Sequence, residues 1–159
     1  MSNLDKKVEA MMRLCVTEDE QDKDQIRQEI RNYLLQNSRN NMDPEQEIRR
    51  ILLELGAPDH LVGHPYVVQA VLMVVENRNY IDSITLSLYP QLAAKFETTP
   101  SRVERAIRHL VEVTWTRGDW EVLTRYFGNT VSAEKGKPTN GEFLARLANV
   151  VKLRMREAA

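Results

Sequence analysis

Basic side chains that could bind a nucleic acid are concentrated between Arg102 and His109. When these residues are placed on a helix at about 100° each, the apolar ones from Val103 to Thr114 share one arc and the polar ones fill the opposite side. The polar side carries Ser101, Arg102, Glu104, Arg105, Arg108, His109 and Glu112. An arginine can donate to guanine O6 and N7 together, and a carboxylate such as Glu104 can accept from cytosine N4. The pattern favours a helix whose N-terminal turns contact bases and phosphates in the major groove.

A solvated helix surface is the competing interpretation of the same residues. Arginines on a helix are commonly exposed without a binding role, and Glu104 with Arg108, or Arg105 with Glu112, could form ordinary surface pairs. Pattern alone leaves both interpretations open.

The residues just before this helix support the DNA-binding interpretation. Leu92, Ala93 and Phe96 lie on one face of a short helix predicted over residues 89–96. The segment Glu97–Thr99 is typical of a tight turn, in which Thr99 is a good helix cap and the following Pro100 a good first helical residue. Two helices joined by a turn of three or four residues form a helix-turn-helix unit.

The remaining sequence predicts an all-α protein. Helical spacing of apolar residues, with caps and breakers, predicts helices over residues 4–15, 24–36, 44–55, 66–76, 81–88, 89–96, 100–117, 120–127 and from Thr139 to the C-terminus. The segment 66–76 is rich in valine and apolar nearly all round, so propensity would also allow a strand; its length and neighbours favour a buried helix. Asn and Ser residues followed by Pro44 predict a boundary between a helical extension, 1–43, and one compact domain of about six helices, 44–159.

Composition restricts the classes of protein that fit. The 159 residues suffice for one domain and an appendage, and the single cysteine excludes an internal disulfide. The longest apolar stretch, 67–75, is too short to cross a bilayer, and the N-terminus lacks the apolar core of a signal peptide. We therefore expect a cytoplasmic protein with no membrane partner. The net charge is −4 through Glu47 and +3 beyond it, an acidic leader on a mildly basic body.

Catalytic and metal-binding chemistry find little support. His60 and His64 have a spacing that could suit a metal, but they flank Gly63 and Pro65 in a predicted loop with no evident third ligand. The aspartates between residues 19 and 24 lack the glycine and terminal glutamate of a calcium loop. A Gly-rich phosphate loop, a nucleophile elbow and paired carboxylates are all absent from the sequence. We expect no enzyme activity, no metal and no cofactor.

Several short motifs resemble the C-terminal effector domain of the Spo0A sporulation response regulators. The resemblance covers about residues 46 to 157, and its longest and most specific part is SRVERAIRH, residues 101–109. The other matching motifs are Ser83-Ile-Thr85, Leu88-Tyr-Pro90, Ala94-Lys-Phe96, Thr98-Thr99, Trp115-x-Arg117-Gly118, Phe127-Gly128-x-Thr130-Val131-Ser132, Lys137-Pro-Thr-Asn140 and Glu142-Phe143.

The resemblance implies a six-helix domain that binds short boxes of double-stranded DNA as tandem or dimeric units and contacts an RNA polymerase sigma factor. Carried over by position, the base- and phosphate-facing residues would be Arg102, Glu104, Arg105, Arg108 and His109. Near the DNA backbone at the helix start would lie Thr98, Thr99 and Ser101. The polymerase-facing or partner-facing surface would fall around 118–127, with Arg117, Asp119, Trp120, Glu121 and Arg125.

Two departures from the family pattern limit what the resemblance implies. The family carries an N-terminal phosphorylation receiver, and residues 1–45 are too few to form its doubly wound sheet, so phosphorylation control is not expected. The segment 119–126 diverges more than the helix over 100–117, so DNA recognition transfers better than polymerase activation.

The sequence thus predicts a DNA-binding, nucleoid-associated transcriptional regulator that acts without a receiver domain. One alternative is an antagonist that pairs with a full-length regulator or a sigma factor through its helices. Another is a competitor that occupies the same DNA boxes without activating transcription. The apolar stripes of residues 4–15 and 26–34 could fold back on the main domain, form a dimerisation or partner-binding hairpin, or stay disordered.

Overall fold

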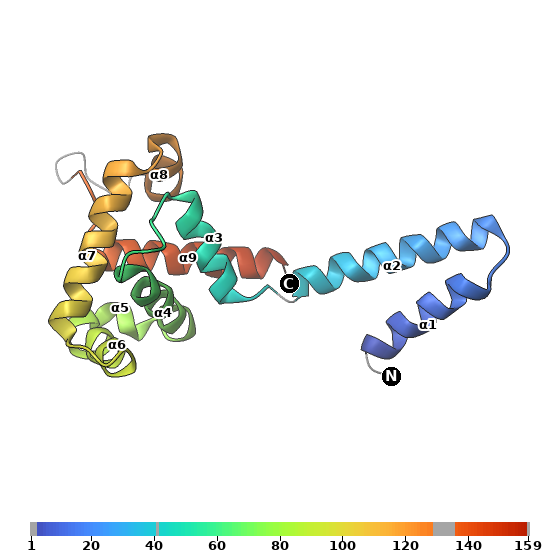
Figure 1. Cartoon of the computed structure of the whole chain (residues 1–159), viewed down its shortest axis with the longest axis horizontal. Coiled ribbons are helices and arrows are strands. Elements are labelled where there is room, and N and C mark those ends of the chain that lie inside the picture. The colour runs from blue at the N-terminus through green and yellow to red at the C-terminus, as the bar shows by residue number, and fades with distance from the viewer. Residues whose placement is uncertain (1–2, 41, 129–135, 159) are drawn as a thin grey trace. The chain divides into compact units, whose positions relative to one another are not determined.

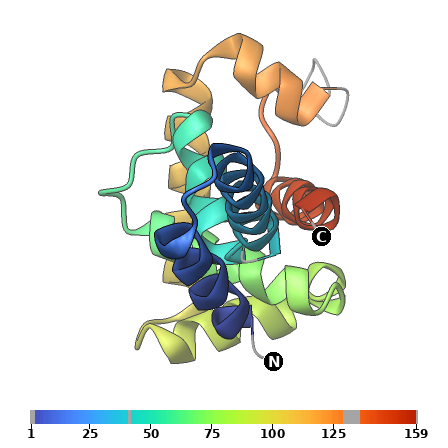
Figure 2. The ribbon, with the colours of Figure 1, turned by 90° about the vertical axis from the view of Figure 1, so that its right-hand side faces the viewer.

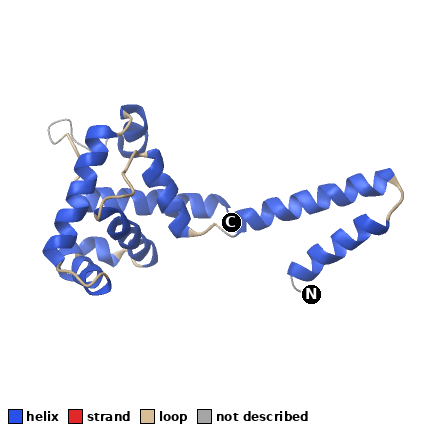
Figure 3. Ribbon diagram, viewed as in Figure 1, coloured by secondary structure: helices blue, strands red, loops and turns tan. Residues whose placement is uncertain are grey.

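The computed structural model describes residues 3–40, 42–128 and 136–158, and the elements in these ranges are all helical (Figure 3). The described part of the chain contains no strand, so the predicted all-α class is confirmed. The chain divides into two compact units, Met1–Met42 with Ala158–Ala159, and Asp43–Glu157. We describe each unit by itself.

The first unit is a helical hairpin. Helices α1 (Asn3–Val16) and α2 (Glu20–Asn40) lie side by side and run in opposite directions (Figures 1 and 2). The Asp19 carboxylate accepts from the backbone N–H of Gln21 at 2.9 Å and so caps the start of α2. Helix α2 continues beyond residue 36, where we expected it to end. Asn and Ser cost a helix only a fraction of a kcal/mol each, about 0.7 at most, so this run weakens the helix without ending it.

The second unit contains more elements than the six or so expected. These are α3 (Pro44–Glu54), α4 (Gly63–Glu76), α5 (Asn79–Asp82), the π-helical turn η1 (Ile84–Leu88), α6 (Tyr89–Lys95), α7 (Pro100–Arg117), α8 (Trp120–Phe127) and α9 (Asn140–Ala158). The helix predicted over 81–88 is divided, because Ser83 adopts a non-helical backbone (φ −138°, ψ 53°) between α5 and η1. The segment that could have been a strand is the buried helix α4.

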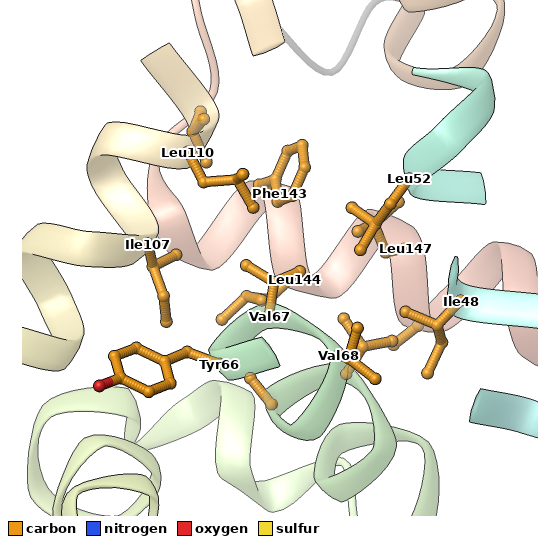
Figure 4. Close-up of a cluster of buried hydrophobic side chains, with 14 of the residues drawn as sticks. Ile48, Leu52, Tyr66, Val67, Val68, Ile107, Leu110, Phe143, Leu144 and Leu147 are labelled. Carbon is orange, nitrogen blue, oxygen red and sulfur yellow. The ribbon is translucent and has the colours of Figure 1, made fainter. Parts of the chain in front are cut away.

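Helix α4 is central to the core of this unit. Its side chains Tyr66, Val67 and Val68 meet residues from three other helices, as Figure 4 shows. The partners are Ile48 and Leu52 of α3, Ile107 and Leu110 of α7, and Phe143, Leu144 and Leu147 of α9. Contact with neighbours on several sides explains why α4 is apolar nearly all round.

Two glycines allow helices to approach closely. A Cβ on Gly63 would lie 2.2 Å from the carbonyl oxygen of Ala106, so only glycine lets the start of α4 pack against the middle of α7. Gly56, at φ 74°, ends α3 in a left-handed turn. There the N–H of Ala57 reaches the Leu52 carbonyl at 2.9 Å, which is the Schellman pattern. The close approach at Gly63 positions α4 against α7, and the turn at Gly56 ends α3.

Candidate nucleic-acid interface

The turn between α6 and α7 consists of the four residues 96–99. The N–H of Thr98 donates to the Ala93 carbonyl at 2.9 Å, and Glu97 between them takes the left-handed conformation at φ 52°. Thr99 then caps α7, since its hydroxyl accepts from the N–H of Arg102 at 3.4 Å, and Pro100 occupies the first helical turn. The predicted cap and the predicted helix-turn-helix connection are both present.

The inner face of α7 is fixed by burial. Its buried residues are Val103, Ile107, Leu110, Val111 and Thr114. The Thr114 hydroxyl donates to the Leu110 carbonyl at 2.7 Å, which satisfies this buried polar group within the helix. Phe96, the residue that follows α6, packs against α4, since its ring centroid is 4.7 Å from that of Tyr66. The orientation of α7 is therefore determined by the core.

The outer face of α7 gathers the cations that the sequence pattern singled out. The exposed residues there are Ser101, Arg102, Arg105, Arg108 and His109. At the start of the helix Thr99 is exposed and Thr98 is half-buried. The guanidinium groups of Arg102 and Arg105 have no hydrogen-bond or ion-pair partner within the described ranges. These two side chains can therefore donate to an anion without first losing an internal bond.

The carboxylate of Glu104 is in a different state. It is half-buried and accepts from the guanidinium of Arg108, one turn further along α7. The sequence pattern suggested that Glu104 accepts from a cytosine. A carboxylate that is already bonded to Arg108 is less available for that contact. Its geometry fits a residue that orients Arg108.

Asn140 connects this region to the last helix. Its side-chain amide donates to the Tyr89 hydroxyl at 3.0 Å and to the Glu104 carbonyl at 3.1 Å, joining the start of α9 to α6 and α7. Burial raises the pKa of Tyr89 above its usual value, so the phenol stays neutral and can accept this bond. The sequence placed Asn140 only at a helix start. The predicted capping box is confirmed, with Thr139 N–H to Glu142 at 2.9 Å and Glu142 N–H to Thr139 at 3.2 Å.

A groove of about 610 Å³ runs beside the outer face of α7, between this helix and the segment that leads into α9. Lys137 on the far side donates to Glu112 at 2.8 Å. This hydrogen bond lowers the pKa of Glu112 below its usual value. Because Glu104 and Glu112 are both paired with cations, the unpaired charges in the first turns of α7 are those of Arg102 and Arg105.

The surface predicted to face a partner lies on α8 and at the end of α7. Arg117, Glu121 and Arg125 are exposed, and Trp120 is 68% exposed. Asp119 has a structural task, because its carboxylate accepts from the N–H groups of Glu121 at 2.8 Å and Val122 at 3.3 Å and so caps α8. The motif residues Thr130, Val131 and Ser132 lie outside the described residues.

A hydrogen-bonded cluster around Arg154, which the sequence did not reveal, joins α3, α8 and α9. Arg154 donates to the Glu47 carboxylate at 2.5 Å and to the Tyr126 hydroxyl at 2.7 Å, and that hydroxyl donates to Glu54. Glu47 is only 2% exposed. Burial opposes the charge on Arg154, but its bonds to Glu47 and Tyr126 raise its pKa above the usual value. Burial and the bond to Glu54 raise the pKa of Tyr126.

The two histidines considered as metal ligands differ in their surroundings. His64 is buried, and burial lowers its pKa below the usual value, whereas His60 is exposed. Nowhere in the described ranges do three His, Cys, Asp or Glu side chains gather so that they could hold a metal ion. Within the same ranges, none of the helices has both the length and the apolar character that a bilayer span requires.

Comparison with protein families supplies an assignment for the second unit. The family model described as the C terminal of sporulation initiation factor Spo0A matches residues 48–151. The match includes α4 to α8 entirely and most of α3 and α9, and leaves the α1–α2 hairpin outside. Because it covers more than half of the chain, the protein belongs to the family of Spo0A C-terminal domains, which are DNA-binding effector domains and not enzymes.

Proposed function

We propose that the protein is a sequence-specific, nucleoid-associated transcriptional regulator that contacts DNA with the outer face of α7. The observation that carries the proposal is the pair of exposed arginines, Arg102 and Arg105. Their guanidinium groups have no partner in the described structure, and they lie in the first turns of a helix whose other face is buried. N-terminal turns are where a recognition helix meets base edges. The helix dipole adds positive potential at the same end.

The contacts divide into two groups. Arg102 and Arg105 would contact base edges, since neither guanidinium is engaged elsewhere in the described ranges. Arg108, held by Glu104, would bind a phosphate together with His109. Thr98, Thr99 and Ser101 would contact the DNA backbone at the start of α7, where free N–H groups favour a phosphate.

Fluorescence anisotropy across a salt series tests this proposal. We expect a family-type box to bind more tightly than a scrambled duplex by roughly 100-fold or more. Arg105→Ala should remove about 1–3 kcal/mol of that preference. Arg49→Ala, which removes an exposed arginine of α3 that is paired with Glu45 at 2.7 Å, is the matched control and should change little.

Equal, weak binding of both duplexes, with or without Arg105, would reject the proposal. If deletion of residues 1–40 removes the biological activity and Arg105→Ala does not, the protein acts instead as an antagonist that pairs with another regulator or a sigma factor through its N-terminal helices.

We propose further that α8 faces RNA polymerase, with a sigma factor as the partner. The supporting observation is Trp120, a large aromatic side chain left 68% exposed next to the capped start of α8. Aromatic side chains of this kind frequently anchor protein interfaces. Trp120→Ala should leave box binding intact and reduce activated transcription in a reconstituted assay. If transcription does not depend on Trp120, the competitor interpretation gains support: a protein that occupies boxes without activating.

A further inference from the structure

Helix α1 of the N-terminal hairpin has two faces that differ in what they contact. Helix α1 packs against α2, and its residues Ala10 and Leu14 are half-buried. A second stripe, at positions i, i+3, i+4 and i+7, consists of Val8, Met11, Met12 and Cys15, and all four are exposed. Met11 is 52% and Met12 65% exposed. The spacing is that of a helix–helix seam, so the more apolar face of α1 is left uncovered.

The hairpin needs burial that its own two helices do not supply. Among the side chains described in this unit, Ile26 of α2 is the one that is fully buried. Units below about 40 residues rarely bury enough apolar surface to be stable alone. A third or fourth helix packed on the α1 stripe would provide the missing burial.

The distribution of charge along the hairpin indicates which partner fits. The turn end, residues 18–24, carries five carboxylates and one lysine, whereas the opposite end of the hairpin, residues 3–9 with 31–42, carries two lysines and two arginines against two carboxylates. Two hairpins placed antiparallel bring the acidic turn of each beside the basic end of the other. A parallel pair would place the two acidic turns together, at a cost in repulsion.

We propose that the α1–α2 hairpin binds a second copy of itself, antiparallel and about a twofold axis near Met11 and Met12. A self-complementary patch of this kind is what a twofold dimer requires, because each copy presents the same surface to the other. The product is a four-helix assembly with the α1 stripes at its centre. In combination with the proposed DNA binding, the dimer carries two α7 helices, one from each copy, that can bind paired boxes. Only this last consequence rests on the proposed function.

Sedimentation velocity of the full chain, without DNA and at micromolar concentration, tests the assembly. We expect twice the 18.4 kDa mass of the chain for the wild type. Met12→Glu should produce the monomer, because it places a charge in the centre of the seam. Gln28→Glu, which adds the same charge at an exposed position of α2, should remain dimeric. A monomeric wild type, including one in which the hairpin folds back on its own effector unit, overturns the proposal, and so does a dimer that Met12→Glu leaves intact.

Disulfide trapping tests the antiparallel direction and needs no destabilising substitution. Val8→Cys supplies a partner for the native Cys15. Seven residues of helix separate the two positions by about 10 Å, too far for a bridge within one chain. Antiparallel copies should give a disulfide between position 8 of one chain and Cys15 of the other on mild oxidation. Disulfides joining 8 to 8 and Cys15 to Cys15 would show a parallel pair and overturn this arrangement.

The test of the dimer and the test of DNA binding can fail independently. Loss of the dimer in Met12→Glu leaves the unpartnered arginines of α7 unchanged, so a single box should bind with the wild-type affinity. The mass measured by sedimentation does not depend on Arg105, so a failure of the Arg105→Ala binding test would leave the dimer proposal standing.

Discussion

The arginines on the outer face of α7 and Arg154 on α9 carry the same charged group in opposite settings. The side chains of Arg102 and Arg105 are exposed and have no partner in the described structure. Arg154 bonds to the buried Glu47 and to Tyr126. The difference teaches that, in this unit, the bonds made by an arginine and not its position on a helix distinguish a group available for binding from one that holds helices together.

The energetic consequences of the two settings differ as well. An exposed ion pair contributes about 0–1 kcal/mol, since water solvates both groups when they separate. Removing one partner of a buried pair costs more, because the remaining charge stays in a poorly solvated place. The first two of the four predictions that follow depend on this contrast.

The largest effect is expected for Arg154→Ala. Glu47 would lose its closest cation, and the free energy of unfolding should fall by about 3 kcal/mol, as measured by urea denaturation. Arg50→Ala is the control, since Arg50 lies 3.4 Å from the same carboxylate but is 64% exposed. It should cost less than about 1 kcal/mol. Equal losses in the two variants would contradict the contrast between buried and exposed arginines.

Arg108→Ala and Arg49→Ala sharpen the contrast at the surface. Each arginine pairs with a glutamate four residues earlier on its helix, Glu104 and Glu45 respectively. Both variants should lose only about 0.3–0.5 kcal/mol of stability. Arg108→Ala alone should weaken DNA binding, by about 1 kcal/mol for every sequence, and lower the salt slope by about one. Unchanged binding in Arg108→Ala would remove Arg108 from the interface.

The contrast also explains which features the sequence could predict. The arc of polar residues on α7, the Thr99 cap and Pro100 are local patterns, and their geometry follows from helical periodicity alone. The Glu47–Arg154 pair joins residues 107 positions apart, and such a contact leaves no local pattern. For the same reason Asn140 could be assigned to a helix start but not to its bonds with Tyr89 and Glu104.

Local patterns also led to several wrong boundaries. Helices α2 and α4 begin at Glu20 and Gly63, before the expected residues 24 and 66, so His64 and Pro65 lie in the first turn of α4 and not in a loop. Helix α2 continues through the Asn and Ser residues where it was expected to stop, because these residues only weaken a helix. The helix expected over 81–88 is divided at Ser83 into α5 and η1. Conversely, the core decides in favour of a helix where propensity was ambiguous, since α4 is buried on several sides.

Two left-handed residues extend the comparison to the turns that end helices. Glu97 ends α6 before the outer face of α7, and Gly56 ends α3, with φ of 52° and 74°. Only a glycine adopts this conformation without steric cost. Glu97→Gly should therefore stabilise the protein by about 0.5–1 kcal/mol, and Gly56→Ala should destabilise it by about 1 kcal/mol. Thermal or urea unfolding measures both, and a loss of stability in Glu97→Gly would show that its side chain makes compensating contacts.

Two histidines provide the smallest and most selective test. Burial, with a further effect of Arg49, lowers the pKa of His64 below 6.5 in the folded protein. As the pH falls below 6.5, the unfolded chain binds the proton first, so the free energy of unfolding should decrease. His64→Gln should flatten this dependence when urea unfolding is measured at pH values on both sides of 6.5. His109→Gln, on the exposed face of α7, should leave the dependence as it is. A slope that persists in His64→Gln would assign the pH dependence to the carboxylates and not to the buried imidazole.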